Sequence, residues 1–196
     1  MKPLDSAPTT LVRESGVLVM TIDHDTIRGV TPAMLDWWFR HIGGTMTYQG
    51  KTLSRYRVWH PRDHIDWQLA GGPSDSVGVG SRFRIVEAFG RNADYLVDST
   101  ELVEKLDETG ILLTRSFGGE QVFSLEHQFE AVREGTRYRS RMQVGGTGLV
   151  GRMFFNRFVG PALMSDGMGH AWLRHNIEEV GNFEFFLPAL YASEKP

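Results

Sequence analysis

HAWLRHNIEEVGNFEFF (residues 170–186) has the apolar spacing of a long helix and follows a strand-rich part of the chain. An α-helix brings residues four positions apart onto one face, so His175 and Glu179 point the same way. That face also carries three apolar side chains, those of Met168, Trp172 and Phe183. The pair is either an ordinary pair of neighbours at the edge of the apolar face or part of a metal site.

The chain upstream of this helix reads as a series of strands. GVLVMTID (16–23) predicts a first strand, and turn signals rich in Gly, Asn and Asp separate five more, near 80–89, 94–103, 110–117, 121–131 and 136–144. Residues 151–186 then become helical. This order predicts an α+β fold in which a curved antiparallel sheet packs against a long C-terminal helix and encloses a cavity.

The segment between the first strand and the others carries a short aromatic helix. Thr31 and Pro32 suit the N-cap and first position, and Gly43-Gly44 stops the helix. Its aromatic side over 32–42 predicts packing into the core. A lid over the pocket and a contact surface in a homodimer remain alternative roles for the same aromatic residues. A short strand with Tyr56, Val58 and His60 on one side is expected next, ended by Pro61.

Composition limits the function. The 196 residues suit a single domain over 1–196, with an irregular segment over 1–14. Arg and Lys number 21 against 24 Asp and Glu, without long single-sign runs, so neither nucleic acid nor an anionic membrane is expected as a partner. The absence of cysteine leaves His, Asp and Glu as metal ligands. No signal peptide or apolar span is recognised, which predicts a cytoplasmic protein.

Two expected strands place a polar side chain on an apolar face. In GSRFRIVEAFG (80–90), Glu87 shares its side with apolar residues, and in QVFSLEHQFEA (121–131) His127 does the same. A buried carboxylate needs a cation or a hydrogen-bond donor, which an arginine or a tyrosine could also supply. For His127, a neutral core histidine bonded to a backbone carbonyl is the plain alternative.

WHPRDH (59–64) supplies the remaining candidates, His60, Asp63 and His64. This cluster is either a polar turn whose side chains cap backbone groups or the source of one histidine ligand. One of its histidines, with the strand glutamate and the helix pair, gives two imidazoles and two carboxylates from three separated elements. That set suits zinc first, with Mn, Fe or Co less favoured.

The chain shows no GxGxxG, P-loop, HExxH or GxSxG motif. GGTGLVG (145–151) is glycine-rich but does not match a phosphate-binding pattern, and we expect it to form a turn before the helix. Nucleotide cofactors are therefore not expected.

Four segments together resemble the diacetylphloroglucinol hydrolase and phloretin hydrolase family. They are TPAMLDWWFRHI (31–42), YRVWHPRDHIDW (56–67), IVEAFG (85–90) and the His-x-x-x-Glu helix, and WHPRDH and HNIEE are the most specific. The resemblance runs from about Thr31 to Phe186. It implies a START-like helix-grip domain, of the shape also seen in Bet v allergens, and a zinc ion held by two His and two Glu.

Carried over by position, the resemblance implies the metal ligands His64, Glu87, His175 and Glu179. His64 is preferred to His60 because the family's substrate-contacting tyrosine and first histidine ligand are eight residues apart, as Tyr56 and His64 are here. Tyr56 and His127 would face the substrate. Members of the family are longer at the N-terminus and have a wider gap between the first His and the first Glu, which leaves the pocket mouth and the substrate open.

The activity implied by the resemblance is hydrolysis of a carbon–carbon bond between an acyl group and a phenolic ring, as in a diacetylphloroglucinol-like or phloretin-like substrate. His127, Tyr56 or Tyr138 could orient phenolic oxygens or relay a proton. Six aromatic residues are expected to form the walls of the pocket: Phe83, Phe89, Phe123, Phe129, Trp172 and Phe183. Two alternatives remain: a metal-free carrier of a hydrophobic ligand, and a polyketide cyclase or dehydratase that uses His127 and Glu87 as acid and base.

Overall fold

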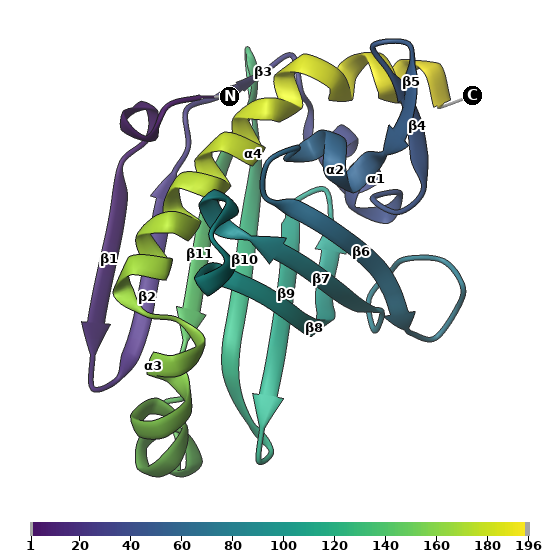
Figure 1. Cartoon of the computed structure of the whole chain (residues 1–196). Coiled ribbons are helices and arrows are strands. Elements are labelled where there is room, and N and C mark those ends of the chain that lie inside the picture. Colours follow the sequence, from purple (N-terminus) through teal and green to yellow (C-terminus); the bar gives the residue numbers. More distant parts are fainter. Residues whose placement is uncertain (1, 195–196) are drawn as a thin grey trace.

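The computed structural model describes residues 2–194 and consists of a large curved sheet and a long helix (Figure 1). The strands of the large sheet are β1 (Thr9–Glu14), β2 (Val17–Asp23), β3 (Ile27–Arg28), β6 (His64–Gly71), β7 (Arg82–Ala88), β8 (Leu96–Asp107), β9 (Gly110–Phe117), β10 (Glu120–Val132) and β11 (Gly135–Val144). They follow the order β1-β2-β11-β10-β9-β8-β7-β6, with β3 also paired to β11, and every pairing is antiparallel. β4 (Thr45–Tyr48) and β5 (Lys51–Ser54) form a separate hairpin.

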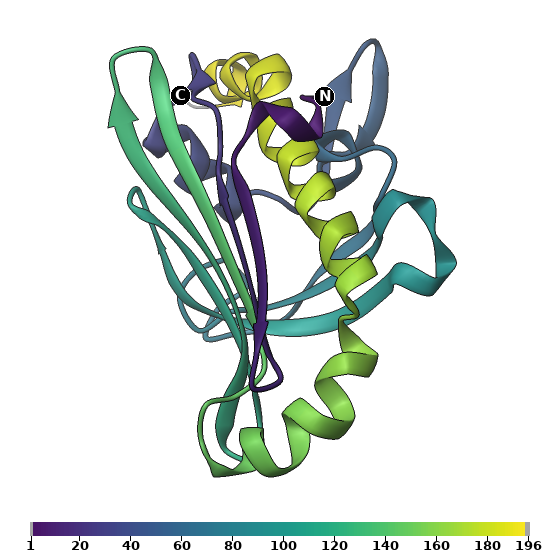
Figure 2. The ribbon, with the colours of Figure 1, turned by 90° about the vertical axis from the view of Figure 1, so that its left-hand side faces the viewer.

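The helices lie before and after the main run of strands. They are α1 (Pro32–Arg40), α2 (Arg55–Trp59), the π-helix η4 (Gly151–Val159), α3 (Gly160–Leu163) and α4 (Asp166–Glu194), with short 3₁₀ turns η1 (Leu4–Ser6), η2 (Phe89–Arg91) and η3 (Ala93–Tyr95). Figure 2 shows α4 running along the concave side of the sheet. None of the helices among the described residues is long and apolar enough to cross a membrane.

The expected antiparallel sheet with a long C-terminal helix across one face is therefore confirmed. The face of α4 that meets the sheet is buried, and it includes Trp172, His175, Glu179 and Phe183. The N-terminal half of α4 packs with β2 and β11, and its C-terminal half packs with α1 and α2. α4 thus links the concave side of the sheet to the two short helices α1 and α2.

α1 begins as expected, because Thr31 Oγ1 accepts a hydrogen bond from the Met34 N–H and Pro32 occupies the first turn. Its aromatic face packs into the core, where the Trp38 ring lies 5.0 Å from that of Phe186, measured between centroids. Phe39 is buried on the same face. Core packing, the first of the roles considered for this helix, describes its position.

Two local expectations are wrong. Residues 1–14 are not irregular throughout, because β1 pairs with β2 through a two-residue turn at Ser15 and Gly16, both with positive φ. Residues 55–59 form one helical turn, α2, rather than a strand. The Ser54 hydroxyl caps this turn, and tertiary hydrogen bonds from Asn182 to the Val58 and Trp59 carbonyls hold it against α4, which outweighs the strand preference of its residues.

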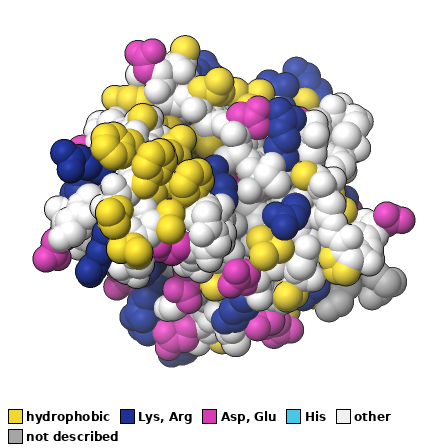
Figure 3. All heavy atoms as spheres, turned by 90° about the horizontal axis from the view of Figure 1, so that it is seen from below, with side chains coloured by type: hydrophobic (Ala, Val, Ile, Leu, Met, Phe, Trp, Pro, Cys, Tyr) yellow, Lys and Arg dark blue, Asp and Glu magenta, His cyan; other side chains and the backbone are white. Residues whose placement is uncertain are grey.

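One end of the molecule is apolar on its surface (Figure 3). η4, α3, the loop before η4 and the end of β9 supply the exposed residues Phe117, Leu149, Met153, Phe154, Phe158 and Leu163. The rings of Phe117 and Phe154 are stacked with centroids 6.0 Å apart. Leu163 also lines the internal cavity described below, so this apolar end adjoins the cavity.

Candidate active site

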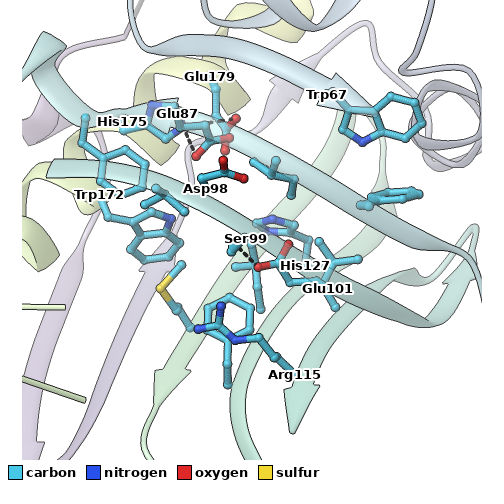
Figure 4. A pocket seen from close by; sticks show the side chains of 18 of the residues that line it. Trp67, Glu87, Asp98, Ser99, Glu101, Arg115, His127, Trp172, His175 and Glu179 are labelled. Atoms are coloured by element: carbon cyan, nitrogen blue, oxygen red, sulfur yellow. Dashed lines mark hydrogen bonds and ion pairs between the residues drawn. The ribbon is translucent and has the colours of Figure 1, made fainter. Parts of the chain in front are cut away.

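A cavity of about 230 Å³ lies between the concave face of the sheet and α4. Its walls are mainly apolar and aromatic, and include Phe39, Phe83, Phe89, Phe123, Trp172 and Trp67. Phe129 and Phe183, also expected in the walls, are buried but do not line it. Polar side chains gather at a few places on the wall (Figure 4).

Two strands and α4 bring together His64, Glu87, His175 and Glu179, which we call the four-donor cluster. His64 opens β6 and pairs directly with Glu87 of β7, while the other two lie one turn apart on α4. His64 Nε2 lies 3.4 Å from Glu87 Oε1 and 3.2 Å from Glu179 Oε2. His175 Nε2 lies 3.7 Å from Glu87 Oε2 and 3.6 Å from Glu179 Oε2.

Hydrogen bonds orient both imidazoles of the cluster. His64 Nδ1–H donates to the Tyr56 carbonyl at 2.7 Å, and His175 Nδ1–H donates to Asp63 Oδ2 at 3.1 Å. These tautomers leave the lone pair of each Nε2 facing the carboxylates. His64 Nε2 is buried and has no hydrogen-bond partner among the described residues. Histidine ligands of metals are commonly fixed in this way through their second ring nitrogen.

Burial dominates the protonation of the cluster. It lowers the pKa of His64 and brings that of His175 to about 3, so both imidazoles are neutral near pH 7. It also raises the pKa of Glu87 to about 7 and raises that of Glu179 well above its ordinary value. A divalent cation between the four groups would favour the ionised carboxylates and relieve this desolvation.

The residues present fit a metal ion. Two ligands that are each 2.0–2.2 Å from a tetrahedral zinc lie about 3.3–3.6 Å apart. The four Nε2–Oε distances of the cluster, 3.2 to 3.7 Å, match that spacing. Lone pairs that face one another at this distance repel unless a proton or a cation lies between them.

His60, the alternative to His64, uses both of its ring nitrogens elsewhere. Its Nδ1 accepts a hydrogen bond from the Asp63 N–H at 3.1 Å, and its Nε2 lies 3.2 Å from Glu178 Oε2. A second group with ligand-like spacing, His60, Asp63 and His175, exists, but Asp63 is already bonded to His175 Nδ1. The geometry therefore favours His64 over His60 as a member of the cluster.

Asp63 supports the cluster from behind. Burial alone would raise its pKa, but hydrogen bonds from His175 and the Gly90 N–H outweigh burial and lower that pKa to about 2. The carboxylate therefore stays ionised and holds His175 in the tautomer that leaves Nε2 free. The sequence made Asp63 one of the candidates in WHPRDH, either as part of a polar turn or beside a metal ligand. It did not predict the bond to His175, because that partner lies far along the chain.

The three polar residues expected to face the substrate differ in position. Tyr56 lines the cavity, stacks on the His64 ring with centroids 3.9 Å apart, and donates its hydroxyl hydrogen to Glu87. His127 lines the cavity as well. Tyr138 is buried behind it, with ring centroids 5.2 Å apart, and is not among the lining residues.

Ser140 connects His127 to a second buried histidine, His24. The Ser140 hydroxyl lies 2.9 Å from His127 Nδ1 and 2.8 Å from His24 Nε2. One hydroxyl hydrogen can be donated to only one ring, so the other ring must donate to Ser140. While His127 is neutral, its Nε2 is a donor if Ser140 donates to Nδ1 and an acceptor if Nδ1 donates to Ser140. Sequence reasoning missed both Ser140 and His24.

A further polar group, Ser99, Glu101 and Arg115, also lines the cavity and was missed. The alternation that placed Glu87 inside its strand places Ser99 and Glu101 inside the next one, so this signal was present in the sequence. The exact bounds of that strand were needed to use it.

Comparisons with known proteins show the family and the fold. The family model described as "DAPG hydrolase PhiG domain" matches residues 11–192. A phloretin hydrolase from Eubacterium ramulus is 26% identical over 194 residues, which cover 85% of this chain and 65% of that enzyme. The chain therefore spans somewhat less than two thirds of the length of the curated relative that it matches.

Two solved structures show the same fold at low identity. Ara h 8.0201 is 13% identical with a TM-score of 0.55, and the match covers 88% of this chain and 99% of that one. The di-domain ARO/CYC protein BexL, from the BE-7585A biosynthetic pathway, is 14% identical with a TM-score of 0.50, covering 93% of this chain and 52% of that one. The fold is thus of the helix-grip type, as expected.

Proposed function

Because this chain belongs to the DAPG hydrolase PhiG domain family, we propose that it is a metal-dependent hydrolase that cleaves the carbon–carbon bond between an acyl group and a phenolic ring. The observation that carries the proposal is the four-donor cluster on the wall of an apolar cavity. Each of the two neutral imidazole Nε2 atoms lies 3.2 to 3.7 Å from both carboxyl groups, and His64 Nε2 has no hydrogen-bond partner among the described residues. We propose zinc as the ion, before Mn, Fe or Co.

In this proposal His64, Glu87, His175 and Glu179 hold the ion. When bound, it would supply Lewis acidity toward an oxygen and lower the pKa of water. Asp63 and the Tyr56 carbonyl keep the two imidazoles in the binding tautomer. The aromatic wall stacks the ring and excludes bulk water.

The remaining polar residues would handle the phenolic oxygens and the proton that the ring carbon must receive. Burial and the neighbouring Glu87 raise the pKa of Tyr56 well above its usual value, so its hydroxyl stays protonated and can donate. Burial lowers the pKa of His127 to about 3, so it acts as a neutral imidazole whose second nitrogen contacts Ser140. Tyr138, behind the His127 ring, would position that ring rather than touch the substrate.

Metal analysis and product analysis test the proposal together. We expect about one equivalent of a transition metal in protein purified without chelator, and mass spectrometry should detect the carboxylic acid and the deacylated phenol from a panel of acylphloroglucinols. Glu179→Gln should lose both the metal and cleavage. Glu184→Gln, on the same helix but bonded to Lys2, is the matched control and should keep both.

A metal content below about a tenth of an equivalent would contradict the proposal. The enclosed apolar cavity and neutral His127 would then favour the second candidate, a metal-free carrier of a hydrophobic ligand or a polyketide cyclase or dehydratase. Ligand binding without turnover would distinguish the carrier from the cyclase.

A further inference from the structure

Glu101 is a buried cavity residue whose hydrogen bonding within the protein is incomplete. Its relative exposure is 3%, and it lines the cavity together with Ser99 and Arg115. The Ser99 hydroxyl donates to Glu101 Oε1. Glu101 Oε2 is buried and has no hydrogen-bond partner among the described residues. A carboxylate oxygen is one of the strongest acceptors in a protein, and leaving it buried without a donor is costly.

The position of Glu101 separates it from the four-donor cluster along the sheet. Glu87 on β7 pairs with Val97 on β8. Glu101 lies four residues after Val97 on β8 and pairs with Phe83 of β7. At about 3.3 Å per residue this amounts to roughly 13 Å between backbone positions. Figure 4 shows Glu87 and Glu179 at one part of the cavity and Glu101 with Ser99 and Arg115 at another. A ligand that reaches both must extend along the cavity.

The surroundings of Glu101 indicate a neutral donor on a flat ring. Burial raises the pKa of Glu101, and the Ser99 hydrogen bond and the positive charge of Arg115 oppose this rise. The charge of Arg115 also makes a cationic ligand less favourable there. The guanidinium carbon of Arg115 lies 5.7 Å from the centre of the Phe123 ring, and Phe83 lines the cavity beside Glu101. One free acceptor between aromatic walls suits a phenolic hydroxyl group.

We propose that Glu101 is a substrate-binding residue that accepts a hydrogen bond from a ring hydroxyl remote from the scissile acyl group. This inference rests on the proposed hydrolase function for the direction of the substrate, with the acyl group at the four-donor cluster. It assigns the chain to substrates that are hydroxylated at both ends of the molecule. Acylphenols without the remote hydroxyl would then be poor substrates.

A pair of matched substrates tests the proposal in the intact protein. An acylphenol that carries a ring hydroxyl at the end of the molecule remote from the scissile bond is compared with the same compound carrying hydrogen there. We expect the wild type to prefer the hydroxylated compound by about tenfold or more in kcat/KM, mainly through KM, because hydrogen bonds to charged groups are worth at least that factor.

Variants at position 101 test whether Glu101 causes the preference for the hydroxylated compound. Glu101→Leu should reduce the ratio between the two substrates to about one, and the isosteric Glu101→Gln should give an intermediate ratio. Glu104→Gln is the matched control: it removes the same charge from the same strand, but Glu104 is exposed and bonded to Thr114. This control should keep the wild-type ratio. Metal content should be unchanged in all three variants.

The outcomes separate this inference from the proposed function. Equal kcat/KM for the two substrates in the wild type, or an unchanged ratio in Glu101→Leu, would overturn the role of Glu101. If the wild type cleaves neither substrate, the proposed function fails. Quenching of tryptophan fluorescence by the same two compounds then still decides whether Glu101 recognises the hydroxyl, since binding does not require turnover. A Glu101→Leu protein that fails to fold leaves the wild-type and Glu101→Gln ratios as the test.

Discussion

The His64 imidazole is oriented so that one of its ring nitrogens is available to a ligand. Nδ1 donates to the Tyr56 carbonyl, the ring is stacked on Tyr56, and Nε2 is buried without a hydrogen-bond partner in the part of the chain that the structure describes. His60, four residues earlier, is equally buried but is satisfied on both sides. Variants of the two histidines are therefore expected to differ in metal binding.

We expect His64→Asn to abolish metal binding and His60→Asn to retain it with reduced affinity. The first change removes a donor of the cluster, whereas the second removes only a contact of Glu178 and the Asp63 backbone. Loss of outer contacts typically costs about 10-fold to 100-fold in affinity. Metal content after dialysis against graded chelator measures both. Retention of metal by His64→Asn, with loss in His60→Asn, would reverse the assignment.

Ser140 allows a second prediction at this scale. Ser140→Ala leaves nitrogen atoms of His24 and His127 without a partner, which should cost about 1–3 kcal/mol of unfolding free energy. If His127 exchanges protons with the substrate, kcat should fall while KM changes little. Urea unfolding and steady-state kinetics measure the two effects. The exposed Ser116→Ala serves as the control, and equal behaviour of the two variants would deny Ser140 a role.

The sequence predicts some site residues and not others for a physical reason. Glu87 and His127 break the apolar alternation of their own strands, so a local pattern reveals them. The role of Ser140 and His24 depends on the hydrogen bond between them, which joins residues 116 positions apart in the sequence. No local period encodes such a contact. Glu101 lies between these cases, because its strand shows alternation but its charged neighbour Glu104 blurs the pattern.

At the scale of elements, the tight turn between β8 and β9 places the start of β9 against β10, the strand that carries His127. Gly110 opens β9 with φ +150°, and a Cβ atom there would lie 2.2 Å from the His127 carbonyl oxygen. This oxygen belongs to the backbone of β10, which cannot move away as easily as the end of a flexible side chain. The glycine thus permits the close approach of β9 and β10 beside the cavity.

We expect Gly110→Ala to lower the unfolding free energy by about 1–3 kcal/mol, through backbone strain and a displaced strand. Gly78→Ala, where a Cβ would meet nothing within 4 Å, is the control and should change stability little. Chemical denaturation of both variants measures the difference. Similar stability of the two would show that the β9–β10 contact can relax.

Element prediction succeeded where local signals and tertiary contacts agree. The strands that follow residue 80 and the capped helix α1 have matching propensity, pattern and turn residues. α2 failed because Tyr, Val and Trp favour strands, while hydrogen bonds from α4 hold this segment as a helical turn. β1 failed differently: its Ser15-Gly16 turn signal was present in the sequence but the preceding strand is mostly exposed, so it lacks a clear apolar alternation.

At the scale of the whole molecule, buried histidines set the response to acid. Burial lowers the pKa values of His24 and His127 to about 3, below the ordinary value of 6.5. The folded state therefore binds fewer protons than the unfolded state between pH 6.5 and pH 3. Stability should be unaffected by these two groups above pH 6.5 and should fall as the pH drops below it.

The expected loss is about 1.4 kcal/mol per pH unit for each such histidine below pH 6.5. His127→Asn should reduce the slope of the unfolding free energy against pH by the amount that corresponds to close to one proton. His170→Asn, at an exposed position, should leave that slope as in the wild type. Urea unfolding at pH 7.5, 6 and 5 gives the slopes. The same slope in His127→Asn and the wild type would contradict a neutral, buried His127.

The position of α4 in the chain has a consequence for how the protein is made. Every strand of the large sheet precedes Asp166, the first residue of α4, so the ribosome completes the sheet before the helix that covers it exists. A sheet that forms in that interval would expose its aromatic concave surface to water, with two of the four cluster donors still missing. Nascent chains in such a state associate readily. The yield of folded protein should therefore depend on translation speed and chaperone protection during synthesis of α4.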